Sequence, residues 1–199
     1  MSVSVEYNNR EINEIVIKNI LKMIERRGII DSSETEFKKI STSDFQNKNI
    51  FELDKIKIEI YLVNAKLTTI SQGHPLDIYL SNNLNIHKII IAKDVSKKVV
   101  KQIANDYKNA EYWFEKEMLI EFPGVEYVPE HKIITGEERA ELLEKFNEND
   151  LAYILLADMG TRYYGGKVGD ILKIIRPSST AGKSMFYRRV INSSWDNLF

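Results

Sequence analysis

Residues 169–191 read GDILKIIRPSSTAGKSMFYRRVI, and this stretch decides how the C-terminal part of the chain folds. Two runs rich in apolar and β-branched residues flank a loop of proline, serine, threonine and glycine. Strand-forming runs separated by turn-forming residues predict a β-hairpin. The sequence therefore predicts strands at 171–176 and 184–191, joined by a loop at 177–183.

The loop ends in Gly182-Lys183-Ser184, which are also the last letters of a phosphate-binding loop. That motif needs another glycine five residues before the second one, where this chain has Pro177. It must also open a helix whose N-terminal amides face the phosphates, whereas a strand is expected here. The pattern therefore argues against a nucleoside triphosphatase.

The overall composition is that of an ordinary folded protein. The chain has 199 residues and a net charge of −1, and 43% of its residues are hydrophobic. This near-neutral charge argues against a protein that coats nucleic acid or membranes. The absence of cysteine excludes disulfides, thiolate zinc sites and a cysteine nucleophile. With neither a signal-peptide pattern nor a membrane-spanning run, we expect a soluble intracellular protein.

The N-terminal half alternates between helical and strand patterns, which is typical of an α/β domain. Its polar stretch at 31–55 contains one possible short helix, at 43–47. A helix entered after Asp94, its expected N-cap, should carry Val95, Val99, Ile103 and Tyr107 on one face. The other predicted elements are helices at 11–27 and 74–84 and strands at 56–61, 89–92 and 112–122.

Proline and glycine at 123–124 and 128–129 then interrupt the pattern, so we expect two domains, 1–124 and 125–199. In the second domain, Thr135 and Glu138 have the spacing of a capping box that starts a helix. A second helical stretch is expected at 151–157, before the hairpin. The fold class is therefore an α/β domain followed by a small α+β domain.

The sequence offers little support for either of two kinds of metal site. His74, His87 and His131 stand far apart without ligand spacing, which is typical of ordinary polar or partly buried histidines. A metal-dependent nuclease places an acidic residue two positions before a lysine on a strand, and none of the three matches lies on a predicted strand. These matches are Glu36-Lys38, Asp106-Lys108 and Glu130-Lys132.

Two basic features could contact nucleic acid or an acidic protein. From 158 to 191 there are seven basic residues against Asp158 and Asp170, although the acidic helix before them could balance this charge. Lysines at the start of the helix after Asp94 would suit a phosphate contact, or could form an ordinary solvated face. We expect the DNA-proximal residues to be Ser96, Lys97, Lys98 and Lys101.

The C-terminal pattern resembles a known family. Its motifs are Val128-Pro129-Glu130-His131-Lys132, then Arg162-Tyr163-Tyr164-Gly165, then the G-D-x-x-K-I-x-R-x-S-x-T-A-G run at 169–182, then Tyr187-Arg188. In order and spacing they resemble a small archaeal RNA polymerase subunit, whose eukaryotic counterpart is the fifth subunit shared by the three nuclear RNA polymerases. The sequence departs from the family at Ala152, Met159 and Val168, where the family usually has proline.

The resemblance implies a non-catalytic assembly domain, 125–199, that docks on the largest polymerase subunit and neighbouring subunits and uses no cofactor. The partner-binding residues expected from it are Pro129, His131, Arg162, Tyr163, Arg176, Ser179, Thr180, Gly182, Tyr187 and Arg188.

The N-terminal half resembles the family only in the order of its predicted helices and strands. This resemblance implies a jaw-like domain with a nuclease-like fold near downstream DNA. No membrane or small-molecule partner is implied. The resemblance places the protein in the nucleus, or in the viral factory and virion of a large DNA virus. The alternatives are a metal-dependent nuclease and a free nucleic-acid-binding module.

Overall fold

The computed structural model describes residues 8–30, 50–53, 56–124, 128–178 and 180–192. The chain divides into two compact units, Met1–Glu121 and Phe122–Phe199, called here the N-terminal and C-terminal units. The division falls slightly before the domain boundary expected after Gly124. Each unit has its own four-stranded sheet, so the fold is mixed α and β. The short helix expected at 43–47 lies outside the described residues.

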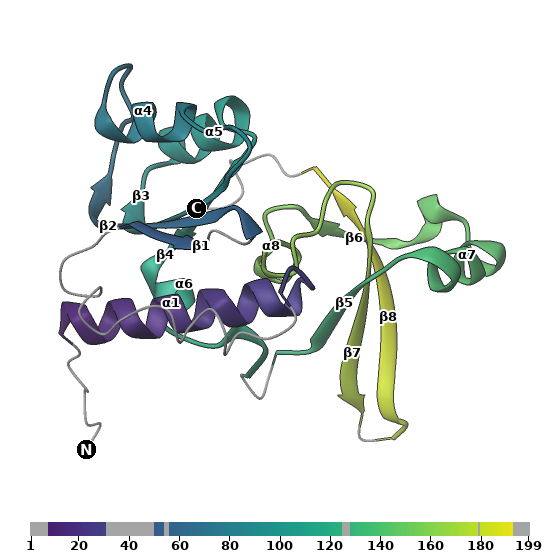
Figure 1. Ribbon diagram of the computed structural model, residues 1–199. Coiled ribbons are helices and arrows are strands. Elements are labelled where there is room, and N and C mark those ends of the chain that lie inside the picture. Colours follow the sequence, from purple (N-terminus) through teal and green to yellow (C-terminus); the bar gives the residue numbers. More distant parts are fainter. Residues whose placement is uncertain (1–7, 31–49, 54–55, 125–127, 179, 193–199) are drawn as a thin grey trace. The chain divides into compact units, whose positions relative to one another are not determined.

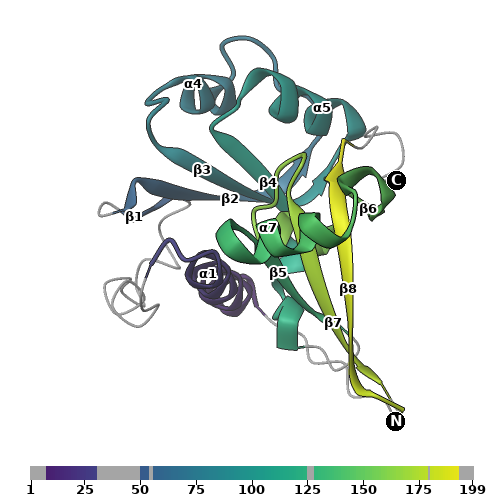
Figure 2. The ribbon, with the colours of Figure 1, turned by 90° about the vertical axis from the view of Figure 1, so that its right-hand side faces the viewer.

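The sheet of the N-terminal unit is mostly parallel. Its strands are β1 (Ile50–Leu53), β2 (Ile58–Leu67), β3 (His87–Val95) and β4 (Ala110–Phe114), in that order across the sheet. β1 runs antiparallel to β2, while β2, β3 and β4 are parallel to one another. Helices cover both faces: α1 (Asn9–Arg26) and α6 (Glu115–Met118) lie on one side, and α4 (Pro75–Ser81) and α5 (Lys97–Asp106) on the other (Figures 1 and 2).

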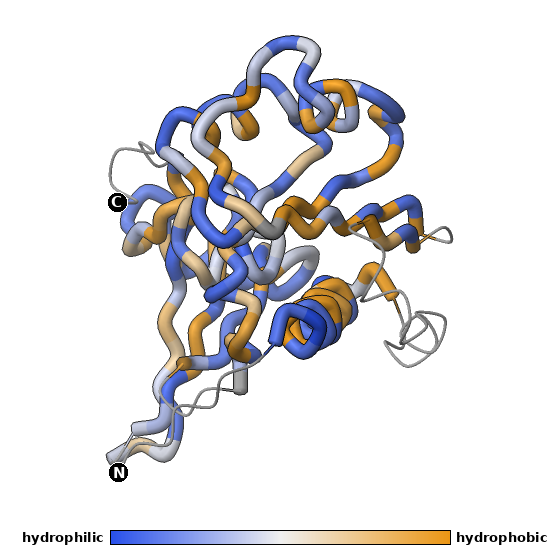
Figure 3. The backbone as a smooth tube through the Cα atoms, turned by 90° about the vertical axis from the view of Figure 1, so that its left-hand side faces the viewer, coloured by the Kyte–Doolittle hydropathy of each residue, from blue (hydrophilic) through white to orange (hydrophobic). Residues whose placement is uncertain are grey.

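The sequence explains this layered arrangement locally. α1 begins with a capping box in which the Asn8 side chain accepts from the Glu11 N–H and the Glu11 carboxylate accepts from the Asn8 N–H. Hydrophobic residues recur along the helix (Figure 3), and Ile17, Ile20 and Ile24 are fully buried. The continuous apolar run of β3 is buried as well, as expected for a strand covered on both faces.

The C-terminal unit has the strand order β5-β7-β8-β6. These strands are β5 (Glu130–Ile134), β6 (Ala152–Leu155), β7 (Ile171–Ser178) and β8 (Gly182–Ile191). β7 and β8 form the predicted hairpin, and β6 pairs with β8 in parallel. The helices are α7 (Gly136–Lys145), α8 (Met159–Tyr163) and the 3₁₀ turns Phe122–Gly124 and Glu148–Asp150.

Both faces of this second sheet carry an apolar cluster. One cluster joins Ile134 and Ile171 of the sheet to Leu142 of α7 and to Leu151. The other joins Leu172, Ile174, Val190 and Ile154. Because neighbouring residues of a strand point to opposite faces, Ile171 and Leu172 supply one cluster each. The hairpin is therefore fixed at its base by burial on both sides.

The structure confirms the hairpin, the buried strand at 89–92, and the helices expected at 11–27 and near 74–84, with somewhat shifted ends. Two expected elements were wrong. The strand expected at 112–122 ends at Phe114, where Glu117 caps the Phe114 N–H at 2.9 Å and α6 begins. The helix expected at 151–157 is instead strand β6, because its backbone pairs with β8.

Two expected caps also differ. α5 is capped by Ser96 rather than Asp94, which lies in β3 and forms an ion pair with Lys66. Thr135 stands at the N-cap of α7 without a capping side-chain bond. Glu138 pairs with Lys132 and Lys173, at 3.1 and 2.7 Å. The Glu138 carboxylate therefore binds two lysines on the neighbouring strands, where in a capping box it would accept from the backbone N–H of Thr135. Within the described residues, no helix is long and apolar enough to cross a membrane.

Candidate functional site

The far end of the hairpin, residues 176–184, extends beyond the rest of its sheet and is called here the hairpin tip. β7 and β8 pair from Ile171 opposite Arg189 to Ser178 opposite Gly182. β5 pairs with β7 only as far as Ile175, and β6 pairs with β8 only from Arg188 onward. The tip is therefore a two-stranded ribbon, and its end projects past β5 (Figure 2).

The loop at the end of this ribbon has the local bonds that its residue types predict. The Ser178 hydroxyl accepts from the Ala181 N–H at 3.3 Å and lies 3.3 Å from the Thr180 hydroxyl. Gly182 has φ of +70°, a conformation that residues with a Cβ rarely adopt. Gly182 then begins a strand and not a helix, so the loop lacks the helix of a phosphate-binding site. Thr180 is exposed, and Ser179 lies outside the described residues.

The two predicted partner-binding arginines lie on the same face of the hairpin. Ile174 lies opposite Phe186, and the alternation of side chains along each strand places Arg176 and Arg188 on the face of that pair. The exposed Arg176 guanidinium lies over the Phe186 ring, 5.4 Å from its centre. The Arg188 guanidinium donates to the Tyr153 carbonyl at 3.4 Å. Arg176 and Phe186 are exposed and Arg188 is half-buried, and together they form a basic and aromatic surface.

A pocket of about 690 Å³ lies between the segment that leads into β5 and the hairpin tip. Its lining residues are Val128, Pro129, Glu130, Ile175, Arg176, Pro177, Gly182 and Lys183. Pro129 of the first motif is thus brought together with Arg176 and Gly182 of the hairpin motif at one concave surface.

Other predicted partner-binding residues lie inside the unit. His131 and Tyr163 are buried. The His131 Nδ1 atom lies 2.7 Å from the Pro129 carbonyl oxygen, and its ring stacks on Tyr164 with centres 6.2 Å apart. A Cβ on Gly160 would come within 3.0 Å of the His131 ring, so the glycine leaves space for the imidazole. In the chain by itself, these residues pack within the unit, and His131 lies opposite Ile174 of the hairpin.

Arg162 and Tyr187 are intermediate in exposure. Tyr187 packs against the apolar cluster under α7 and lies opposite Lys173. The predicted set therefore separates into an exposed group at the tip and a buried or half-buried group in the rest of the unit.

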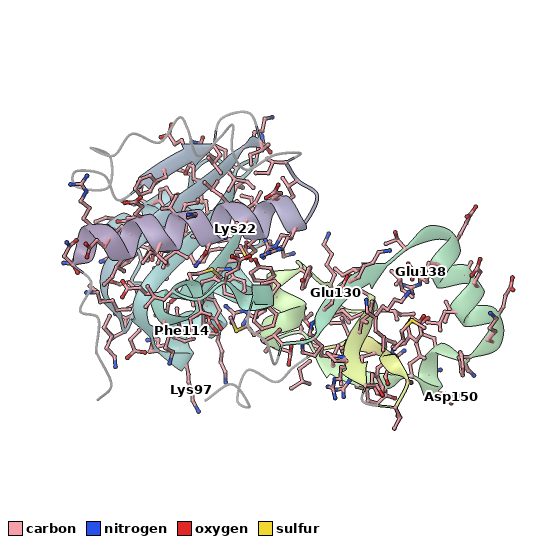
Figure 4. All side chains as sticks on the ribbon, turned by 90° about the horizontal axis from the view of Figure 1, so that it is seen from below. Lys22, Lys97, Phe114, Glu130, Glu138 and Asp150 are labelled. Carbon is pink, nitrogen blue, oxygen red and sulfur yellow. The ribbon has the colours of Figure 1, made fainter. Side chains whose placement is uncertain are left out.

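The four predicted DNA-proximal residues lie at the start of α5. The Ser96 hydroxyl accepts from the Val99 N–H at 3.4 Å and donates to the Thr68 carbonyl at 2.7 Å. Lys97 and Lys98 are exposed and Lys101 is half-buried. Figure 4 shows Lys97 extending outward from the N-terminal unit. The first turn of α5 contains no acidic residue, so positive charge reinforces the positive end of the helix dipole.

Sequence reasoning missed a charged cluster in the N-terminal unit. Arg27 forms two bonds to the Glu111 carboxylate, at 2.7 and 3.0 Å, and His87 lies 3.1 Å from it. Burial raises the pKa of Glu111, but the His87 hydrogen bond and the Arg27 charge outweigh burial and lower the pKa to about 2. These residues are distant in sequence, and no local pattern joins them.

Lys88 was also missed, although it is almost fully buried in β3. Its ammonium group donates to the Leu80 carbonyl at 3.2 Å and to the Asn82 carbonyl at the end of α4. Burial lowers the pKa of Lys88, while nearby Glu59 opposes that shift. The lysine therefore satisfies carbonyls at the negative end of a helix.

One nuclease-type match does lie on a strand, contrary to expectation. Glu130 and Lys132 are both in β5, and the Lys132 side chain pairs with Glu138. Asp106 ends α5, and Glu36-Lys38 lies outside the described residues. In the part of the chain that the structure describes, no three His, Cys, Asp or Glu side chains are grouped so that they could hold a metal ion.

Comparisons with known proteins cover both units. A sequence profile described as "RNA polymerase Rpb5, C-terminal domain" matches residues 121–190. DNA-directed RNA polymerase subunit 5 of Acanthamoeba polyphaga mimivirus is 27% identical over 195 residues, covering 92% of this chain and 94% of that protein. The subunit rpabc1 of DNA-directed RNA polymerases I, II, and III of Dictyostelium discoideum is 28% identical over 192 residues, covering 89% of this chain and 98% of that protein.

A shorter relative matches the C-terminal unit. DNA-directed RNA polymerase subunit Rpo5 of Methanococcus vannielii is 44% identical over 71 residues, which cover 35% of this chain and 91% of that protein. The hairpin motif, the two-unit architecture and these similarities agree. The chain therefore belongs to the RNA polymerase subunit 5 family.

Proposed function

We propose that this protein is a non-catalytic subunit of a multisubunit DNA-directed RNA polymerase. The observation that carries the proposal is the match to the archaeal Rpo5 protein, which is covered to 91% of its length by 35% of this chain. In Methanococcus vannielii, a protein of about the size of the C-terminal unit is thus named as a polymerase subunit by itself. The function common to the family should therefore reside in the C-terminal unit.

The proposed role of the C-terminal unit is to dock on the largest subunit of the polymerase through the hairpin tip. The tip supports this role because it projects from its sheet and carries Arg176 beside the exposed Phe186. Arginine and exposed aromatic residues are common at the energetic centres of protein interfaces. The buried His131 and Tyr163 would hold the base of the hairpin in a fixed shape for docking.

The proposed role of the N-terminal unit is that of a jaw-like domain near downstream DNA. The support is the mixed α/β fold and the lysine-bearing start of α5. Helix N-termini with lysines suit contacts to phosphates that do not depend on sequence. The protein would act where its polymerase acts: in the nucleus for a cellular enzyme, or in the viral factory and virion for a viral one.

The test of the proposed function is recovery of the polymerase from the native cell or infection. The tagged chain is purified at moderate salt, and the proteins that elute with it are quantified by mass spectrometry. We expect the two largest polymerase subunits in amounts near equal to the tagged chain. Elution of the tagged chain without them would overturn the proposal.

The double substitution Lys97→Glu and Lys98→Glu should weaken DNA retention by the assembled polymerase and leave assembly unchanged. Each lost phosphate contact should lower the slope of log affinity against log salt by about 1. The measurement is a salt titration of purified polymerase on double-stranded DNA with no promoter. The control is Lys93→Glu with Lys108→Glu, two exposed lysines of the same unit. Equal retention by both double variants and the wild type would remove the DNA-proximal assignment.

A further inference from the structure

We propose that the open edge of β8, residues 182–187, receives an extended acidic segment of a polymerase partner as an additional strand of the sheet. This inference rests on the proposed function and specifies how the hairpin docks. β6 covers the same edge of β8 only at residues 188–191. Among the described residues, no strand pairs with the remaining part of that edge. Figures 1 and 2 both show this part of β8 without a strand on the side away from β7.

The backbone groups available at this edge follow from the hydrogen bonds at the base of β8. The Val190 N–H donates to the Asp170 carbonyl on the β7 side, whereas the Ile191 carbonyl accepts from the Leu156 N–H on the β6 side. The register with β7 continues from Arg189 to Gly182 one residue at a time. Alternation along the strand therefore directs the N–H and C=O of Met185, and the N–H of Tyr187, to the open edge.

The side chains along the edge are also suited to an added strand. Met185 is 59% exposed on one face of the hairpin and Phe186 is 47% exposed on the other. An open edge beside exposed apolar side chains is a template for pairing with another chain. Main-chain bonds from such an edge supply affinity, and alternate side chains supply specificity.

Charge identifies the partner strand. Residues 171–191 contain five basic residues and no Asp or Glu. Lys183 and Arg188 stand near the two ends of the open segment. Two copies of this edge would repel each other, so the occupant should be a different chain with acidic residues. Lys183 lies on the face of Met185 and Arg188 on the face of Phe186, so the added strand should place an acidic side chain near each cation and apolar side chains beside Met185 and Phe186.

The experiment compares hydrogen exchange in the free chain and in purified polymerase that contains it. We expect the amides of Met185 and Tyr187 to exchange at least about tenfold more slowly in the polymerase, because they gain hydrogen-bond partners. The matched substitutions are Met185→Pro, which removes the edge N–H, and Met185→Val, which keeps it. Proline is tolerated on an edge strand where its missing N–H faces outward, so the free Met185→Pro chain should keep its thermal midpoint.

Recovery of the polymerase with the Met185→Pro chain should fall about tenfold, whereas recovery with Met185→Val should match the wild type. If the Met185→Pro chain recovers the polymerase as well as the wild type does, and the amides of Met185 and Tyr187 stay unprotected, the edge inference fails. The proposed function stands in that case, because the wild type still recovers the polymerase. If the wild type recovers no polymerase, the proposed function fails. A dimer of the free chain that Met185→Pro dissociates would overturn the assignment of a different partner.

Discussion

Replacing Glu111 by Ala should lower the free energy of unfolding of this protein by about 3–5 kcal/mol, the usual cost of breaking a buried ion pair. The side chain of Arg27 is only 8% exposed and that of Glu111 23%. Without the carboxylate, the Arg27 guanidinium stays largely out of water and loses the two hydrogen bonds that it donates to Glu111. The measurement is denaturant unfolding followed by circular dichroism.

The control is Glu121→Ala, which removes another carboxylate that binds the same helix. Glu121 pairs with Lys22 and Arg26 of α1, and all three side chains are about one-third exposed. Ion pairs at the surface contribute about 0–1 kcal/mol, so this variant should be nearly as stable as the wild type. Equal losses in the two variants would contradict the role given to burial at Glu111.

The same pair predicts how stability depends on pH. The pKa of Glu111 falls from 4.5 to about 2 on folding, so the unfolded chain binds a proton more readily. The stabilisation is therefore fully present above the unfolded pKa and is lost as pH falls through the folded one. The stability difference between the wild type and Glu111→Ala should be constant near neutral pH and should shrink between about pH 4.5 and 2.

Local patterns predicted those elements whose cause is local. The hairpin is specified by two strand-forming runs and by Gly182, whose φ of +70° fits a glycine. The helix α1 and the buried strand β3 follow from apolar spacing and from a continuous apolar run. Each of these signals lies within the element itself, so it could be read without knowledge of the partners.

The wrong elements depended on distant partners. Residues 151–157 are apolar enough for either a helix or a strand. Pairing of the backbone at 152–155 with β8 makes this part a strand, β6. Glu138 has the spacing of a capping residue, but Lys132 and Lys173 on adjacent strands bind it instead. The motif spacing also does not distinguish surface from core. Arg176 and Thr180 are exposed, while His131 and Tyr163 from the same motif set are buried.

Replacing Arg176 by Glu should reduce recovery of the polymerase with the tagged chain by about tenfold or more, while the free chain stays folded. Arg176 is exposed, so the main loss within the free chain is its contact with the Phe186 ring, worth about 0.5–1 kcal/mol. In the proposed interface, by contrast, the reversed charge would face an acidic partner, and like charges placed together cost several kcal/mol.

The measurement is recovery of the two largest polymerase subunits per tagged chain, with the thermal midpoint of the free variant recorded in parallel. The control is Lys167→Glu, which makes the same change in net charge at another exposed position of the C-terminal unit. Because Lys167 lies outside the hairpin, its reversal should leave recovery near the wild-type value. If Arg176→Glu recovers the polymerase as well as Lys167→Glu does, the exposed basic face of the hairpin is not the docking surface.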